Sequence, residues 1–134
     1  MQRPVTVVVV DGNSGTRGGV IRRLRQIPGI SVVGEAGDPG EALTMVGDRQ
    51  PEVVLIDLRR LASDGAEFLG RLARAAPDTE VVVLTAYLTE RERADLARAG
   101  ARAILFKEID FEALVRTIRK VTARAVARGR RAEA

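Results

Sequence analysis

Four polar residues in this chain each follow a run of apolar residues. Asp11 follows four valines, Asp57 follows Val-Val-Leu-Ile, Thr85 follows Val-Val-Val-Leu, and Lys107 follows Ile-Leu-Phe. A carboxylate can bind a hard cation or accept a transferred group, a hydroxyl can hydrogen-bond a phosphate oxygen, and an ammonium can pair with a phosphate. If the fold brings these side chains together, they favour phosphoryl chemistry on an aspartate.

Apolar runs of this kind are typical of parallel strands whose two faces are both covered by helices. The sequence predicts such strands at Val5–Val10, Ile30–Val33, Val53–Ile56, Val81–Leu84 and Ala103–Phe106. Strands that alternate with helices predict an α/β fold: a doubly wound, flavodoxin-like parallel sheet with five strands in the order 2-1-3-4-5 and five helices. Because parallel strands share a direction, we expect the four polar residues at one edge of the sheet, where open α/β sheets bind ligands.

Capping residues mark the helix boundaries. We expect Ser14 to cap the first helix and Asp38 to cap the second, with Pro39 at its first helical position. Thr89 should begin the fourth helix and Gly100 should end it. The other expected segments are a polar loop at 58–63, a third helix at about 64–76 and a last helix from 110 to about 128.

The composition limits the class of protein. With 134 residues the chain is long enough for one domain, which we expect at 1–128, followed at 129–134 by a disordered basic tail or the start of a linker. The absence of cysteine and histidine excludes disulfides, thiol chemistry, histidine-ligated metals and a phosphohistidine carrier. No apolar stretch approaches the roughly 18 residues of a membrane span, and the start does not read as a signal peptide, so we expect a cytoplasmic protein without membrane contact.

The net charge of +4 is unevenly distributed. From Arg116 onward there are seven basic residues and one acidic residue, whereas the preceding part has 15 basic and 17 acidic residues. A basic region of this kind is compatible with nucleic-acid binding. It also matches the solvated face of a last helix, and we favour this second interpretation because no aromatic residues are interleaved with the cations.

The residues at the predicted edge favour a metal-assisted site. Asp11 and Asp57 end neighbouring strands, about 4.8 Å apart in such a sheet, so their carboxylates can meet at the switch point. Paired carboxylates suit Mg²⁺, which would neutralise an incoming phosphoryl group; Lys107 can pair with the phosphate and Thr85 can hydrogen-bond it. Taken singly, each residue could be a turn residue, a cap or a solvated side chain, but the four in correct strand order favour the site.

With the segments around them, these residues resemble the receiver domain of two-component response regulators over about residues 5–122. The resemblance is greatest to receivers that precede helix-turn-helix DNA-binding domains in the NarL/LuxR group. The segments that carry it are Val-Val-Val-Asp11, Val-Val-Gly34-Glu35-Ala36, Pro51-Glu52-Val-Val-Leu-Ile-Asp57-Leu, Asp64-Gly65, Val-Val-Val-Leu-Thr85-Ala86, Ala99-Gly100-Ala101 and Phe106-Lys107.

The resemblance implies a phosphoacceptor domain rather than an enzyme, with self-phosphorylation and autodephosphorylation as its own reactions. It implies phosphoryl transfer from a sensor histidine kinase to Asp57, assisted by Thr85 and Lys107, and a resulting change around the fourth helix and fifth strand. It also implies Mg²⁺ held by Asp11, Asp57 and the backbone carbonyl of Arg59. We further expect a homodimer that forms the regulatory part of a transcriptional regulator, with DNA bound only through an additional domain not present in this chain.

Several positions depart from the family pattern. Gly12 stands where receivers usually carry a second acid, Arg60 and Leu61 replace a usual Met-Pro, and Ile104 replaces the switch aromatic. One carboxylate fewer should weaken Mg²⁺ binding, because ligand charge sets affinity for hard cations. Arg59 or Arg60 could instead bring a guanidinium near the acids, although we favour solvent exposure for both. An alternative function is therefore an atypical pseudo-receiver that acts by phosphorylation-independent dimerisation or protein docking.

Overall fold

The computed structural model describes residues 3–57, 65–86, 88–106 and 110–133, with side chains of the last helix described as far as Val126. A five-stranded sheet lies at its centre, in the order β2-β1-β3-β4-β5, and every neighbouring pair is parallel. The predicted doubly wound α/β fold and its strand order are confirmed. The strands are β1 (Val5–Val10), β2 (Ile30–Ala36), β3 (Val53–Asp57), β4 (Glu80–Thr85) and β5 (Ala101–Phe106).

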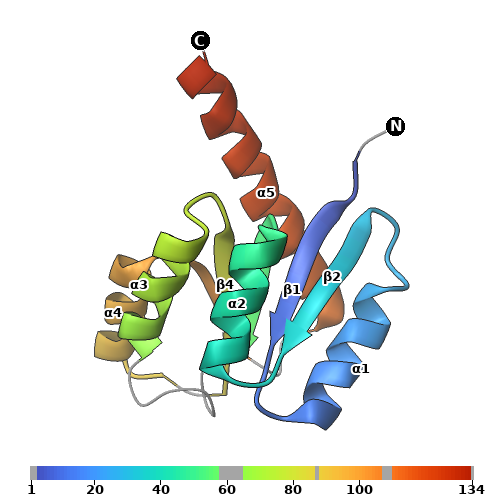
Figure 1. Ribbon diagram of the computed structural model, residues 1–134, viewed down its shortest axis with the longest axis vertical. Coiled ribbons are helices and arrows are strands. Elements are labelled where there is room, and N and C mark those ends of the chain that lie inside the picture. The colour runs from blue at the N-terminus through green and yellow to red at the C-terminus, as the bar shows by residue number, and fades with distance from the viewer. Residues whose placement is uncertain (1–2, 58–64, 87, 107–109, 134) are drawn as a thin grey trace.

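Helices cover both faces of the sheet (Figure 1). They are α1 (Ser14–Leu24), α2 (Pro39–Arg49), α3 (Gly65–Ala75), α4 (Glu90–Ala99) and α5 (Phe111–Glu133). Val8 and Val10 of β1 belong to the core beneath α2, α3 and α4, whereas Val7 and Val9 belong to the core beneath α1 and α5. All four valines are at most 3% exposed. A strand buried on both faces needs an unbroken apolar run, which is the pattern in the sequence.

The cap of α1 differs from the prediction. Asn13, rather than Ser14, is the capping residue, and its side-chain oxygen accepts a hydrogen bond from the backbone N–H of Thr16 at 2.9 Å. Asparagine and serine are both good caps because a short side chain can reach an N–H that the first turn leaves unbonded. The sequence therefore placed the helix start correctly to within one residue.

The other predicted caps are confirmed. Asp38 accepts a hydrogen bond from the third helical N–H of α2, which has proline at its start. Thr89 forms a capping box with Glu92 at the start of α4. Gly100 ends α4 at a φ of 120°, in the left-handed region that favours glycine.

The last helix is longer than predicted. α5 continues to Glu133, so residues 129–133, which we expected to be disordered, are helical. The residues around Gly129 are alanine, arginine and glutamate, all good helix formers, and one interior glycine costs a helix only about 1 kcal/mol. In Figure 1 the end of α5 extends beyond the sheet, on the side where the chain begins.

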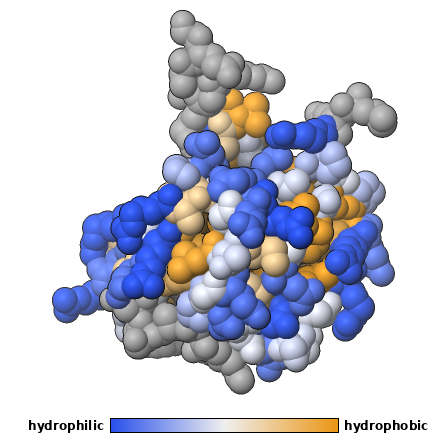
Figure 2. Space-filling model, viewed as in Figure 1, coloured by the Kyte–Doolittle hydropathy of each residue, from blue (hydrophilic) through white to orange (hydrophobic). Residues whose placement is uncertain are grey.

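The face of the molecule seen in Figure 2 is mostly polar where it is coloured. Figure 2 shows hydrophilic side chains over the outer sides of the helices, with hydrophobic residues visible mainly between elements. Among the described residues, none of the helices combines the length and apolar character that a membrane span requires. The predicted loop at 58–63, which contains Arg59, Arg60 and Leu61, lies outside the described residues.

Candidate functional site

The predicted acids and the threonine lie at one edge of the sheet. Asp57 is the last residue of β3, Thr85 is the last residue of β4, and Asp11 directly follows β1. Val10 pairs with Ile56, so the two aspartates each stand one residue beyond a paired position on neighbouring strands. The exposed fractions are 5% for Asp11, 3% for Asp57 and 8% for Thr85. Buried polar residues at the carboxyl ends of parallel strands are the arrangement that the sequence predicted.

A small cavity lies against the two carboxylate-bearing residues. Its volume is about 90 Å³, which is room for several water-sized groups. The wall opposite the strand ends comes from α1. The lining residues are Val9, Val10, Asp11, Thr16, Val20, Leu55, Asp57 and Leu84. The cavity therefore brings the acids of β1 and β3 to one space bounded largely by apolar groups, where charge interactions are stronger than in water.

The turn after β1 is fixed by two consecutive hydrogen bonds. The Asp11 carboxylate Oδ1 accepts from the backbone N–H of Asn13 at 2.8 Å. The Asn13 side chain in turn caps α1, as described above. One turn therefore both holds the Asp11 carboxylate and starts the helix, so local structure contributes to the orientation of Asp11.

Arg17 holds the same turn from the side of α1. Its Nη1 donates to the backbone carbonyl oxygen of Asp11 at 2.7 Å, and its Nε pairs with Glu35 Oε1 on β2 at 2.9 Å. A Cβ placed on Gly37 would lie 3.1 Å from Arg17 Nη1, so glycine at that position leaves room for the guanidinium. Arg17 therefore ties the ends of β1 and β2 together beside the acids.

The sequence analysis missed the capping role of Asn13 and the role of Arg17. A signal for Arg17 exists, because it stands four residues before Ile21 and seven before Leu24, on the stripe of α1 that faces the core. The guanidinium of an arginine on an apolar stripe needs a partner that accepts its hydrogen bonds. Here that partner is Glu35, which lies in one of the segments that carry the family resemblance.

The donor set for a cation is small. Among the described residues no group of three or more acidic, histidine or cysteine side chains could hold a metal ion. Asp11 and Asp57 provide two carboxylates, and Mg²⁺ is often held by only one or two together with water and phosphate oxygens. The described residues thus fit Mg²⁺ with a small number of carboxylate ligands. Gly12 adds no further carboxylate.

Two predicted site residues lie outside the described residues, namely Lys107 and Arg59. The end of β5, which leads to Lys107, is placed beside the site, since Phe106 pairs with Thr85. Ile104, at the position of the switch aromatic, is half-buried and packs against the core beneath α2, α3 and α4. The Ile104 side chain is therefore an aliphatic part of that core.

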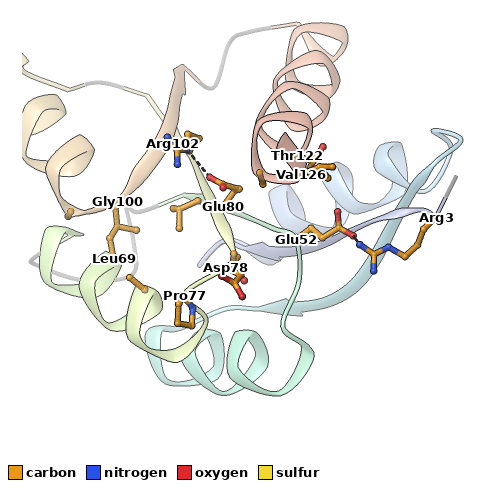
Figure 3. Close-up of a pocket in the computed structure, with 15 residues that line it drawn as sticks. Arg3, Glu52, Leu69, Pro77, Asp78, Glu80, Gly100, Arg102, Thr122 and Val126 are labelled. Carbon is orange, nitrogen blue, oxygen red and sulfur yellow. Dashed lines mark hydrogen bonds and ion pairs between the residues drawn. The ribbon is translucent and has the colours of Figure 1, made fainter. Parts of the chain in front are cut away.

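A larger cavity lies elsewhere. Its volume is about 710 Å³, and it is lined by residues at the starts of β4 and β5 and by α5 (Figure 3). Its main charged groups are paired: Glu80 Oε2 is 2.8 Å from Arg102 Nε, and Glu52 Oε1 is 3.0 Å from Arg3 Nη2. This cavity is at the opposite ends of the strands from Asp11 and Asp57, so it plays no part in the site.

The comparisons with known proteins agree on one family. The model of the response regulator receiver domain matches residues 7–119. The chain is 34% identical over 119 residues to the response regulator GacA of Pseudomonas aeruginosa, covering 89% of this chain and 56% of that protein. It is 33% identical to the DNA-binding transcriptional activator DevR/DosR of Mycobacterium tuberculosis, covering 89% of this chain and 55% of that protein. The chain thus spans about half the length of these relatives.

Solved structures agree with this match. The signal receiver domain of a NarL response regulator from Mycobacterium tuberculosis superimposes with a TM-score of 0.83 at 28% identity, covering 91% of this chain and 98% of that chain. A response regulator from Burkholderia pseudomallei, solved with a phosphorylated aspartic acid and a calcium ion, gives a TM-score of 0.75 at 26% identity, covering 92% of this chain and 72% of that chain.

Proposed function

Because the chain belongs to the response regulator receiver family, we propose that it accepts a phosphoryl group on Asp57 from a sensor histidine kinase. A receiver domain functions in two-component signalling, and family membership implies the kinase as its partner. The observation that supports Asp57 is its position: it ends β3, is 3% exposed, and lines the same cavity as Asp11. The phosphorylated aspartate of the Burkholderia pseudomallei relative is consistent with this assignment.

The proposed step is a displacement at phosphorus. A carboxylate oxygen of Asp57 attacks the phosphorus of the donor phosphohistidine, the P–N bond breaks, and the imidazole leaves and takes up a proton. The product is an aspartyl phosphate, which carries a charge of about −1.5 to −2 in place of the single negative charge of the free carboxylate. Thr85, at the end of the neighbouring strand, would hydrogen-bond a phosphate oxygen, and Lys107 would pair with the phosphate as a point charge. Attack by water on the aspartyl phosphate returns the free carboxylate and releases phosphate, which is the autodephosphorylation expected from the sequence.

The site would use Mg²⁺ during this transfer. Asp11, Asp57 and the backbone carbonyl of Arg59 would hold the ion, which neutralises negative charge on the phosphoryl group when it is bound. Asn13 and Arg17 keep the Asp11 turn in place for this role. Since Gly12 supplies no second carboxylate, we propose that Mg²⁺ binding is weak compared with a three-acid site.

The output of the domain would be regulation of transcription. The relatives of this chain are response regulators, and one bears the name DNA-binding transcriptional activator. We propose that the added charge at Asp57 biases a two-state surface and promotes homodimerisation of a longer regulator.

A second candidate function is docking without phosphorylation. The two-carboxylate donor set and the aliphatic Ile104 both favour it, because they weaken metal binding and remove the aromatic readout that the family pattern supplies. In that case the domain would keep one surface conformation whether or not a kinase is present.

Incubation with acetyl phosphate, followed by intact-protein mass measurement, tests the two candidates. We expect a Mg²⁺-dependent adduct of one phosphate on the parent protein and on an Asp78→Ala control, which removes an exposed acid far from the site. Asp57→Ala should show no adduct. If the parent protein gains no phosphate at any Mg²⁺ concentration, nor with its own kinase, the docking function is favoured instead.

A further inference from the structure

The helices α1 and α5 form one continuous surface on the same face of the sheet. Their inner residues share a core, and two contacts tie the helices together at their edges. The guanidinium carbon of Arg23 on α1 lies 4.2 Å from the ring centroid of Phe111 at the start of α5. Farther along, Arg119 Nη2 of α5 donates to the carbonyl oxygen of Pro28, just after α1, at 3.4 Å. Arg23 therefore lies against the start of α5, and Arg119 lies against the segment that follows α1.

This surface is strongly basic, and we call it the basic face. Residues 14–29 contain no acidic residue, and the described side chains of α5 include one, Glu112. The helices of the opposite face, α2, α3 and α4, contain six acidic and six basic residues. Among the described parts of the helices, the excess of positive charge thus lies on one face of the sheet. The basic face is made of the exposed side chains Arg22, Arg23, Arg25, Arg116, Arg119, Lys120 and Arg124.

Part of the basic face is a regular stripe. Arg116, Lys120 and Arg124 follow one another at intervals of four residues, which places them on one side of α5 at steps of about 6 Å. Like charges at this spacing destabilise a helix by a few tenths of a kcal/mol per pair. The same repulsion disfavours contact between two copies of this face. A negatively charged partner would remove that repulsion, so the charge pattern fits a polyanion.

The lack of apolar anchors favours nucleic acid over an acidic protein. Protein interfaces are centred on buried aromatic or aliphatic anchors, whereas binding to a phosphate backbone needs cations alone. The described residues include two exposed large apolar side chains, Phe106 and Val126. Phe106 ends β5 on the far side of the sheet from β2, and Val126 borders the cavity next to Glu52 and Arg3 (Figure 3).

We propose that the basic face binds the phosphate backbone of duplex DNA without sequence preference. The sequence alone favoured a solvated helix face, because no aromatic residues are interleaved with the cations at the end of the chain. The fold adds the arginines of α1 to those of α5, and the resulting patch on one face is the electrostatic pattern of nucleic-acid binding. Contacts from this surface would increase the affinity of a regulator for DNA, independently of phosphoryl transfer at Asp57.

Fluorescence anisotropy with a labelled 20-base-pair duplex, titrated with the whole chain at several salt concentrations, tests this proposal. About four phosphate contacts predict a slope of roughly −3.6 in a plot of log K against log salt. The variant Arg116→Gln/Lys120→Gln/Arg124→Gln should bind at least about tenfold more weakly at 100 mM salt, with a slope nearer −1. The matched control Arg74→Gln/Arg91→Gln/Arg93→Gln makes the same change in net charge on the opposite face and should bind within about twofold of the parent. Circular dichroism checks that both variants remain folded.

Four results would overturn the proposal. The parent protein could show no saturable binding at 50 mM salt, or the stripe variant could bind as tightly as the parent. Equal losses in the stripe variant and its control would mean that net charge, rather than this face, drives binding. Polyglutamate of matched charge serves as a competitor: failure to displace the duplex supports a phosphate-backbone site, whereas displacement as effective as that by unlabelled duplex would replace DNA with an acidic protein as the partner.

Discussion

Replacing Arg17 by methionine should lower the free energy of unfolding by about 2–3 kcal/mol. The change removes the hydrogen bond to the Asp11 carbonyl and the ion pair with Glu35, but keeps most of the aliphatic stem. A hydrogen bond from a charged donor contributes about 1.5–3 kcal/mol. The Arg17 side chain is only 18% exposed, so its donor regains little water in the folded state. The ion pair adds at most about 1 kcal/mol because the Glu35 side chain is 50% exposed.

Urea unfolding followed by circular dichroism measures this loss. The urea concentration at the midpoint of unfolding should be lower for Arg17→Met than for the parent. The slope of the unfolding free energy against urea concentration should stay unchanged, which identifies a change in stability. Arg22→Met, an exposed substitution on the same helix, is the control and should change stability by less than about 0.5 kcal/mol. A double-mutant cycle with Glu35→Gln should assign less than about 1 kcal/mol to the ion pair, leaving most of the loss to the Asp11 carbonyl.

The same variant should disturb the site. Without the guanidinium, the Asp11 turn loses one of the hydrogen bonds that hold it, so half-maximal phosphorylation by acetyl phosphate should need several-fold more Mg²⁺. Arg22→Met should keep the Mg²⁺ dependence of the parent. If Arg17→Met matched Arg22→Met in both unfolding free energy and Mg²⁺ dependence, the proposed role of Arg17 in positioning Asp11 would be wrong.

Three other substitutions test separate features. Gly12→Asp should restore a second acid and lower the Mg²⁺ concentration needed for phosphorylation by about tenfold or more, measured by the same mass assay. Gly34→Ala places a Cβ 2.4 Å from Met45 Sδ and should destabilise the protein by about 1–2 kcal/mol in urea, with a smaller penalty in a Met45→Ala background. Hydrogen bonds from Thr89 lower the pKa of Glu92 below its ordinary value of 4.5. Their stabilising effect is present above that value and is lost as the pH falls through the folded-state pKa, so the difference in unfolding free energy between the parent and Glu92→Gln should shrink in acid.

The strands were predictable because their signals are local, and their order followed from the usual order of five-stranded doubly wound sheets. A parallel strand covered on both sides must be apolar throughout, and residues such as Asp57 that end these runs are visible without knowledge of the fold. Asp38 and Thr89 were predictable for a related reason, since a cap acts within three residues of itself.

The supporting residues depend on contacts between distant segments. Arg17 reaches Glu35, eighteen positions away, and needs Gly37 to leave room for it, so no local pattern defines the interaction. The basic face has the same origin, because its two helices are far apart in the sequence and adjacent only in the fold. The extension of α5 was missed for a different reason: residues 129–134 show no apolar pattern, although the high helix propensity of the residues around Gly129 favours a helix there.

The most direct test of the central claim is to locate the phosphoryl group. The protein is incubated with acetyl phosphate and Mg²⁺, reduced with borohydride, digested and analysed by tandem mass spectrometry. Borohydride converts an aspartyl phosphate to homoserine, so the reaction marks the modified residue. We predict homoserine at position 57, absent when acetyl phosphate is omitted. Homoserine at position 11, or at no position in a protein that does gain phosphate, would contradict the assignment of Asp57 as the acceptor.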